Sequence, residues 1–72
     1  MNIFIIGLGL IGGSFALDIQ QAFKNATIYG IDSNEEHGDL ALEKGIIHQK
    51  AVFSELSNAD IVIIAIPVDV SQ

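Results

Sequence analysis

The residues best placed for chemistry in this chain are three glycines, which lie within residues 7–14 of sequence GLGLIGGS. This stretch directly follows residues 3–6, an apolar run typical of a buried strand, and it leads into an amphipathic helical pattern. The spacing G-x-G-x-x-G between a strand and a helix lets the backbone turn sharply and lets an anion approach the main chain. The pattern therefore predicts a loop that binds the pyrophosphate of a dinucleotide.

Each glycine of this loop has its own expected task. Gly7 allows the turn at the end of the strand, Gly9 allows the pyrophosphate to come close, and Gly12 allows the helix to pack tightly on the sheet. The backbone N–H groups of Leu10 and Ile11, at the positive end of the helix dipole, are the expected donors. In isolation, the same pattern is also compatible with a plain glycine-rich turn.

A carboxylate at the expected distance favours the binding site over the plain turn. Asp32 ends a second strand-like run, residues 27–32, and it lies 20 residues after Gly12, as expected for an acid that binds the adenosine ribose. A carboxylate there repels a 2′-phosphate, and the chain contains no arginine to neutralise one. These features predict NAD rather than NADP as the cofactor, with the alternative that Asp32 is an ordinary turn residue.

Three further residues complete the expected cofactor site. Ser33 follows the acid, and Ala65 and Pro67 lie at the end of the last strand, where the cofactor should cross the sheet. His37 and His48 lack a metal-ligand spacing and are assigned no role, so neither a metal site nor a catalytic residue is predicted.

Hydrophobic periodicity and turn signals predict alternating strands and helices. The first helix should begin near Gly12, bury Phe15, Ile19 and Phe23, and stop near Asn25. A second helix is expected over residues 34–44, with Ser33 and Glu36 as a capping box and Gly45 at its end. Strands are expected over residues 2–7, 27–32, 46–48 and 60–67, with one helical turn over residues 54–56.

This order is that of the first half of a doubly wound α/β fold of the Rossmann type, with a parallel sheet of strand order 3-2-1-4. The last strand is apolar on both faces, which is typical of the middle of a covered sheet. In a chain of this length it would instead be an exposed edge. We therefore expect residues 1–72 to be the N-terminal part of a longer dinucleotide-binding domain, or to need a partner.

Composition limits the other classes of function. The chain has 72 residues, is 50% hydrophobic, carries a formal net charge of −6 and contains no cysteine. Clustered cations for nucleic-acid binding are absent from the sequence, and the apolar N-terminal stretch is too short and too interrupted by glycine for a membrane span. A cytoplasmic protein that binds neither nucleic acid nor membrane is expected.

The chain also resembles prephenate dehydrogenases and the related arogenate dehydrogenases. The resemblance lies in residues 7–14, 29–32, 45–48 and 59–68, in this order, and the Gly13-Ser14 pair is its most specific element. It implies NAD(P)-dependent oxidative decarboxylation of prephenate to 4-hydroxyphenylpyruvate, in the synthesis of tyrosine. By the same resemblance, the loop holds the pyrophosphate and Asp32 holds the ribose.

The resemblance also implies parts that this chain does not contain. Members of the family continue into the second half of the nucleotide-binding domain and then into a helical domain that forms the homodimer and builds much of the prephenate pocket. The catalytic histidine of the family lies beyond the part matched here. The 72-residue chain alone is therefore expected to be inactive. Two alternatives remain open: a dehydrogenase of the hydroxyisobutyrate or pyrroline-carboxylate reductase type, and a nucleotide-sensing module without catalysis.

Overall fold

The computed structural model describes residues 1–10 and 13–65 of the chain. Strands and helices alternate along it, with two short 3-10 helices (η1 and η2) between them. The elements are β1 (Asn2–Ile6), η1 (Leu8–Leu10), α1 (Gly13–Ala22), β2 (Thr27–Ile31), α2 (Glu35–Glu43), β3 (Gln49–Lys50), η2 (Phe53–Asn58) and β4 (Ile61–Ile64).

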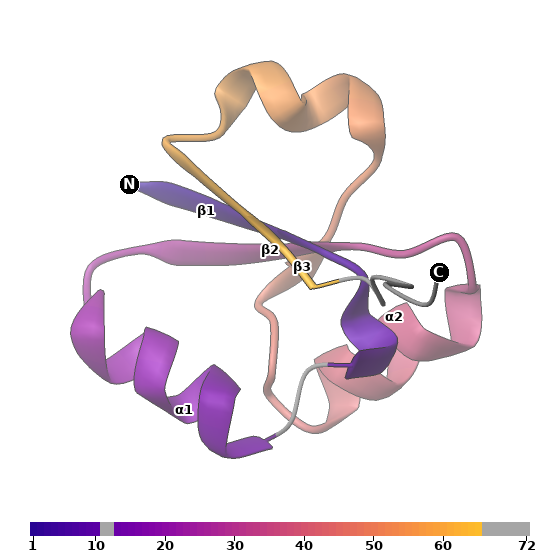
Figure 1. The fold of residues 1–72 in the computed structure, drawn as a ribbon, viewed down its shortest axis with the longest axis horizontal. Helices are drawn as coiled ribbons and strands as arrows, with labels where there is room; N and C mark the ends of the chain where they lie inside the picture. Colours follow the sequence, from indigo (N-terminus) through magenta and orange to yellow (C-terminus); the bar gives the residue numbers. More distant parts are fainter. Residues whose placement is uncertain (11–12, 66–72) are drawn as a thin grey trace, which may run out of the picture.

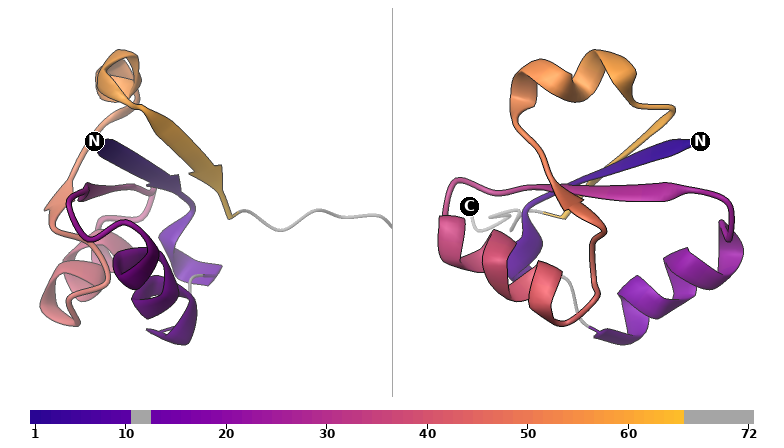
Figure 2. Two further views of the ribbon diagram at one scale, coloured as in Figure 1. Left: turned by 90° about the vertical axis from the view of Figure 1, so that its left-hand side faces the viewer. Right: turned by 180° about the vertical axis from the view of Figure 1, so that it is seen from behind.

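The four strands form one parallel sheet in the order β3-β2-β1-β4, which confirms the predicted topology. Both α-helices lie on one side of this sheet, and η2 lies on the other (Figures 1 and 2). Because all strands run the same way, their carboxyl ends meet at one edge, where the turns after β1 and β2 lie next to each other.

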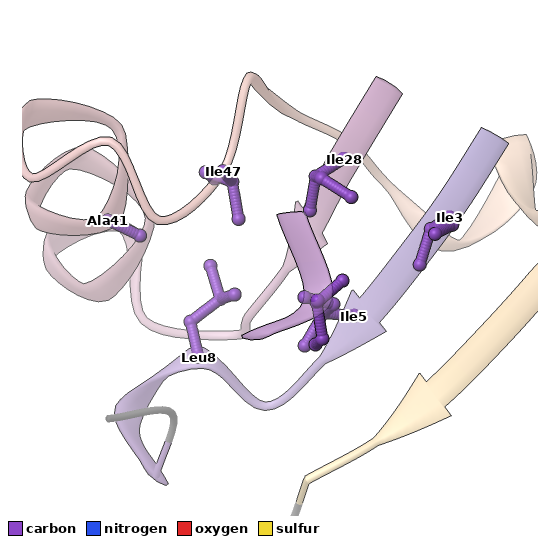
Figure 3. Packing of buried hydrophobic residues seen from close by; sticks show 7 residues of the cluster. Ile3, Ile5, Leu8, Ile28, Ala41 and Ile47 are labelled. Carbon is purple, nitrogen blue, oxygen red and sulfur yellow. The ribbon is translucent and has the colours of Figure 1, made fainter. Parts of the chain in front are cut away.

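The core lies between the sheet and the two helices. Ile3, Ile5 and Ile28 on neighbouring strands are fully buried there, and they meet Ala41 of α2 and Ile47 in the segment before β3 (Figure 3). Alternate residues point to the other face of the sheet, as the period of a strand requires. On that face Phe4 stacks on Tyr29, with ring centroids 4.6 Å apart.

The predicted buried stripe of the first helix is only partly correct. Ile19 is buried and joins the core, but Phe15 and Phe23 are 44% and 37% exposed. A helical period identifies the face that turns inward, but burial also requires atoms opposite each residue of that face. In the described chain, Ile19 is the residue of this stripe that is covered by atoms of the core. The helix ends at Ala22, before the predicted stop at Asn25.

The start of α2 differs from the predicted capping box. Asn34, and not Ser33, is the N-cap, and its side-chain oxygen accepts a hydrogen bond from the backbone N–H of Glu36 at 2.9 Å. The shift has a local cause, because the carboxylate of Asp32 already accepts from the N–H of Asn34 at 2.8 Å. This contact holds the chain extended for one more residue before the helix begins. At the other end, Gly45 adopts a φ of 73°, as predicted for a residue that ends a helix.

The predicted third strand is displaced along the chain. It was expected over residues 46–48, but β3 comprises Gln49–Lys50. The N–H groups of Ile46 and Ile47 donate to the carbonyl of Ala41, so they complete the end of α2 instead of pairing with β2. Pairing starts with His48, whose N–H donates to the carbonyl of Ile28 at 2.8 Å.

The last strand lies at the edge of the described sheet. β4 pairs with β1, and Val62 and Ile64 on one of its faces are 45% and 64% exposed. Within the described sheet β4 is therefore an edge strand with one exposed face, as expected for a chain of this length, and not the covered interior strand that is typical of such an apolar run. The 3-10 helix before it confirms the predicted helical turn and is longer than expected.

Candidate functional site

The glycine loop follows β1 directly. Gly7 has a φ of 90°, a conformation that glycine adopts without the strain of a side chain. Its N–H donates to the carbonyl of Ile31 at the end of β2, at 2.9 Å. The chain then forms η1, a single 3-10 turn that the sequence did not predict. The loop is thus anchored to the end of the neighbouring strand.

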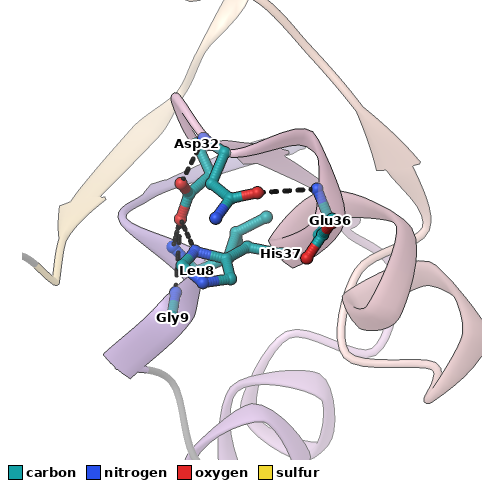
Figure 4. Close-up of polar contacts among 6 residues, drawn as sticks. Leu8, Gly9, Asp32, Glu36 and His37 are labelled. Atoms are coloured by element: carbon teal, nitrogen blue, oxygen red, sulfur yellow. Dashed lines mark hydrogen bonds and ion pairs between the residues drawn. The ribbon is translucent and has the colours of Figure 1, made fainter.

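Asp32 lies immediately after β2 and contacts this loop (Figure 4). Its Oδ2 atom accepts hydrogen bonds from the N–H groups of Leu8 at 2.7 Å and Gly9 at 3.2 Å. Its Oδ1 atom accepts from the N–H of Asn34 at 2.8 Å. The structure thereby brings together two features that the sequence places more than twenty residues apart. The carboxylate also has a structural task, because it holds the turn after β1 against the turn after β2.

The electrostatic state of Asp32 follows from two opposing effects. Burial of its side chain, which is only 10% exposed, raises the pKa of the carboxyl group. The hydrogen bonds from Asn34, His37, Leu8 and Gly9 favour the charged form, and together they lower the pKa below its ordinary value. Asp32 is therefore an anion at neutral pH.

His37 is a member of this site that sequence reasoning missed. Its Nδ1 atom lies 3.2 Å from Oδ2 of Asp32. The ring also covers Gly9, because a Cβ atom built on Gly9 would lie 2.8 Å from Cε1 of His37. The Asn34 cap places His37 in the first turn of α2, close to the end of β2 from which Asp32 projects. The only available signal was the five-residue separation of Asp32 and His37 across a helix start.

Two hollows flank the pair of Asp32 and His37. One has a volume of about 200 Å³ and lies over the carboxyl ends of β2 and β3; its lining includes Asp32, Asn34, Gly38, Lys50 and Glu55. The other has a volume of about 300 Å³ and lies between η1 and α2; it is lined by Leu8, Gly9, His37, Leu40, Ala41, Lys44 and Ile46. The second hollow opens beside the glycine loop, because Leu8 and Gly9 are part of its lining.

The remaining predicted cofactor residues are placed as follows. Ser33 is exposed in the turn after Asp32. Ala65 follows β4 and donates its N–H to the carbonyl of Ile6 at 2.8 Å, so it lies at the same carboxyl end of the sheet as the glycine loop. Leu10 ends η1. Ile11, Gly12 and Pro67 lie outside the described residues.

Two kinds of feature are absent from residues 1–10 and 13–65. No group of three or more His, Cys, Asp or Glu side chains there is arranged to hold a metal ion. Within the same ranges, no helix has both the length and the apolar character needed to cross a membrane.

The sheet order, the glycine turn after β1 and the acid after β2 together define the class of the protein, which is a nucleotide-binding α/β domain of the Rossmann type. Comparison with protein families identifies the particular kind. Residues 15–72 match the family described as "Prephenate dehydrogenase, nucleotide-binding domain", and the chain belongs to this family.

Two curated relatives agree with this assignment. A prephenate dehydrogenase of Lactococcus lactis subsp. cremoris (strain MG1363) is 44% identical over 71 residues, which cover 97% of this chain and 20% of the relative. A prephenate dehydrogenase of Bacillus subtilis (strain 168) is 44% identical over 70 residues, which cover 94% of this chain and 19% of the relative. The chain therefore spans about a fifth of the length of the curated relatives it matches.

Proposed function

We propose that the chain binds NAD, with the pyrophosphate on the glycine loop and the adenosine ribose on Asp32. The observation that supports this proposal is the 2.7 Å hydrogen bond from the N–H of Leu8 to Oδ2 of Asp32, because it joins the proposed ribose acid to the glycine loop. The cofactor-binding residues of this proposal are Gly7, Gly9, Leu10, Ile11, Gly12, Asp32, Ser33, Ala65 and Pro67.

The hydrogen bonds of Asp32 are compatible with ribose binding. A carboxylate oxygen can accept at least two hydrogen bonds, and Oδ1 accepts one from Asn34 in the described structure. A ribose hydroxyl can therefore donate to Oδ1 while Oδ2 keeps the loop in place. Since the N–H groups of Leu8 and Gly9 are engaged by Oδ2, the pyrophosphate is expected to use the donors of residues 10–12.

The charge of Asp32 supports NAD over NADP. The lowered pKa keeps the carboxylate ionised at neutral pH, and an anion at this position repels the 2′-phosphate of NADP. The chain contains no arginine, which is the usual partner of that phosphate.

The family supports a proposal for the whole protein that carries these residues. It is a cytoplasmic, homodimeric enzyme that oxidatively decarboxylates prephenate to 4-hydroxyphenylpyruvate, with NAD as the acceptor of the hydride. In this proposal the chain orients the cofactor, and the catalytic groups lie outside residues 1–72. The assay with prephenate and NAD therefore belongs to the longest natural polypeptide that carries the chain, and residues 1–72 alone should show no turnover.

The decisive experiment compares the affinities for NAD and NADP, measured by calorimetry on the longest natural polypeptide, before and after Asp32→Ala. Loss of the ribose contact should weaken NAD binding by about tenfold or more and move the ratio of the two affinities toward NADP. If the variant only loosened the loop, it would instead weaken the binding of NAD and of NADP equally. Asp39→Ala is the matched control, because Asp39 is an exposed acid paired with Lys50. An unchanged NAD affinity in Asp32→Ala would contradict the proposal.

A further inference from the structure

The contact between His37 and Asp32 puts a titratable group beside the acid that recognises the ribose. We propose that His37 is a positioning residue whose protonation state sets the preference of the cofactor site at the ribose 2′ position. The inference rests on the proposed function, since it concerns the choice between NAD and NADP at that same site.

The geometry gives His37 a fixed place in the site. Its Nδ1 lies 3.2 Å from Oδ2 of Asp32, the same oxygen that accepts from the N–H groups of Leu8 and Gly9. Its ring is held against the backbone of Gly9, where a side chain would collide with it. The ring of His37 therefore lies between the carboxylate and the backbone of the loop, with 43% of its side chain exposed.

The charge of the imidazole changes the charge of the whole pair. When His37 is neutral and carries its proton on Nδ1, the pair bears the single negative charge of Asp32. When the ring is protonated, Nδ1 still donates to Oδ2, but the pair is close to neutral. The contact persists in both states, so NAD binding should change little, whereas the repulsion of a 2′-phosphate should weaken on protonation.

Three other charged groups of the described chain lie near the ring. Asp32 faces the ring from the end of β2, and Glu36 is the neighbour of His37 in sequence. Lys44, the C-cap of α2, lines the hollow between η1 and α2 that His37 also lines. From η1, the backbone of Leu8 and Gly9 faces the ring and contributes no titratable group. Histidine is the side chain that ordinarily changes charge between about pH 5 and 8, so His37 is the group that makes the preference depend on pH.

The test measures dissociation constants for NAD and NADP between about pH 6 and pH 8, on the longest natural polypeptide. The quantity compared is the dissociation constant for NADP divided by that for NAD. As the pH rises over this range, this ratio should increase about fivefold more in the wild type than in His37→Asn. Asparagine keeps a donor near the position of Nδ1 but does not titrate. It therefore reports the part of the pH dependence that comes from the 2′-phosphate itself, whose own pKa is about 6.

His48→Gln is the matched control. His48 lies at the opposite end of β2, where its Nδ1 accepts a hydrogen bond from the N–H of Ile28 at 2.9 Å. This variant should keep the full pH dependence of the wild type. Equal pH dependence in the wild type and in His37→Asn would overturn the inference. If neither cofactor binds the wild type, the proposed function itself fails and the inference fails with it.

A second measurement does not depend on a variant that folds. The ring protons of His37 can be titrated by NMR in the NAD complex and in the NADP complex of the wild type. Linkage requires the midpoint to lie at higher pH with NADP, because the 2′-phosphate stabilises the protonated ring. Identical midpoints in the two complexes would overturn the inference even if His37→Asn cannot be prepared.

Discussion

Asp32 is the residue on which the candidate site depends most. As a ribose acid it was expected to face a ligand, but its carboxylate also accepts three backbone hydrogen bonds that hold two turns together. A residue that only bound a ligand could be removed without cost to folding. Asp32 stabilises the chain whether or not a cofactor is present, so its replacement should affect stability and binding by separable amounts.

Asp32→Asn should lower the free energy of unfolding at pH 7 by about 1–3 kcal/mol. The backbone N–H donors use both oxygens of the carboxylate, whereas an amide side chain has only one acceptor oxygen. The folded-state pKa of Asp32 is lowered. Its stabilising effect is therefore present above the unfolded-state pKa of about 3.9 and is lost as the pH falls through the folded-state value.

Denaturant unfolding at neutral pH and at about pH 3 measures both parts of this prediction. The gap between the wild type and Asp32→Asn should narrow on acidification. Asp39→Asn, which removes an exposed ion pair with Lys50, should leave stability nearly unchanged, because exposed ion pairs contribute little. A gap of the same size at both pH values would contradict a stabilising role for the Asp32 charge.

Gly9→Ala should disturb His37 before it disturbs the fold. The new Cβ would lie 2.8 Å from Cε1 and 3.0 Å from Nδ1 of His37, so the ring must move away from residue 9. We expect the NMR signals of the His37 ring to shift while those of the His48 ring stay in place. Unchanged His37 signals would show that the ring does not rest on Gly9 in solution.

At the scale of elements, the glycine in β2 decides how closely the glycine loop and the segment before β3 can pack on that strand. Gly30 is buried, and a Cβ on it would lie 2.7 Å from Cδ1 of Ile47 and 2.8 Å from Cδ1 of Leu8. Leu8 opens η1, so this packing ties the position of the glycine loop to the sheet. Gly30→Ala should destabilise the chain by about 1–3 kcal/mol through overpacking, measured by thermal or denaturant unfolding; a neutral effect would show that these side chains have room to move.

The glycine within α2 and the glycine that follows its end give a matched pair, because alanine should change stability in opposite directions at the two positions. Gly38→Ala should stabilise α2 by about 0.5–1 kcal/mol, because the three atoms nearest its Cβ would all belong to the flexible stem of Lys50. Gly45→Ala should cost about 1 kcal/mol, because Gly45 has a φ of 73° although the space around it is open. Circular dichroism melts of the two variants provide the comparison, and a shared sign would contradict the assigned helix end.

At the scale of the whole molecule, the described sheet presents an apolar edge. Val62 and Ile64 of β4 are exposed, and an edge strand with apolar side chains is prone to pair with another chain. The isolated 72-residue chain should therefore self-associate as its concentration rises, and Ile64→Lys should weaken that association. Sedimentation at increasing concentration tests this, and a monomer at all concentrations with a cooperative melt would contradict it.

The amount of the fold that the sequence predicts differs between its elements. The buried strands β1 and β2 and the sheet order were predicted well, because apolar runs, glycines and a right-handed crossover rule leave few other topologies. The start of α2 and the position of β3 were not. Each was decided by a short-range hydrogen bond that hydrophobic periodicity and turn signals do not specify: from the N–H of Asn34 to Asp32 in one case, and from the N–H of Ile46 to the carbonyl of Ala41 in the other.

The same division holds for the candidate site. By itself, the sequence determined the glycine loop, the acid 20 residues after its third glycine, and the expectation of a dinucleotide, because these depend on spacing along one strand–helix–strand unit. Only the tertiary structure decided that Oδ2 of Asp32 engages the loop, that His37 rests on Gly9 beside it, and that Phe15 and Phe23 remain exposed. These depend on which atoms of distant segments meet in space, and no local period or spacing encodes such contacts.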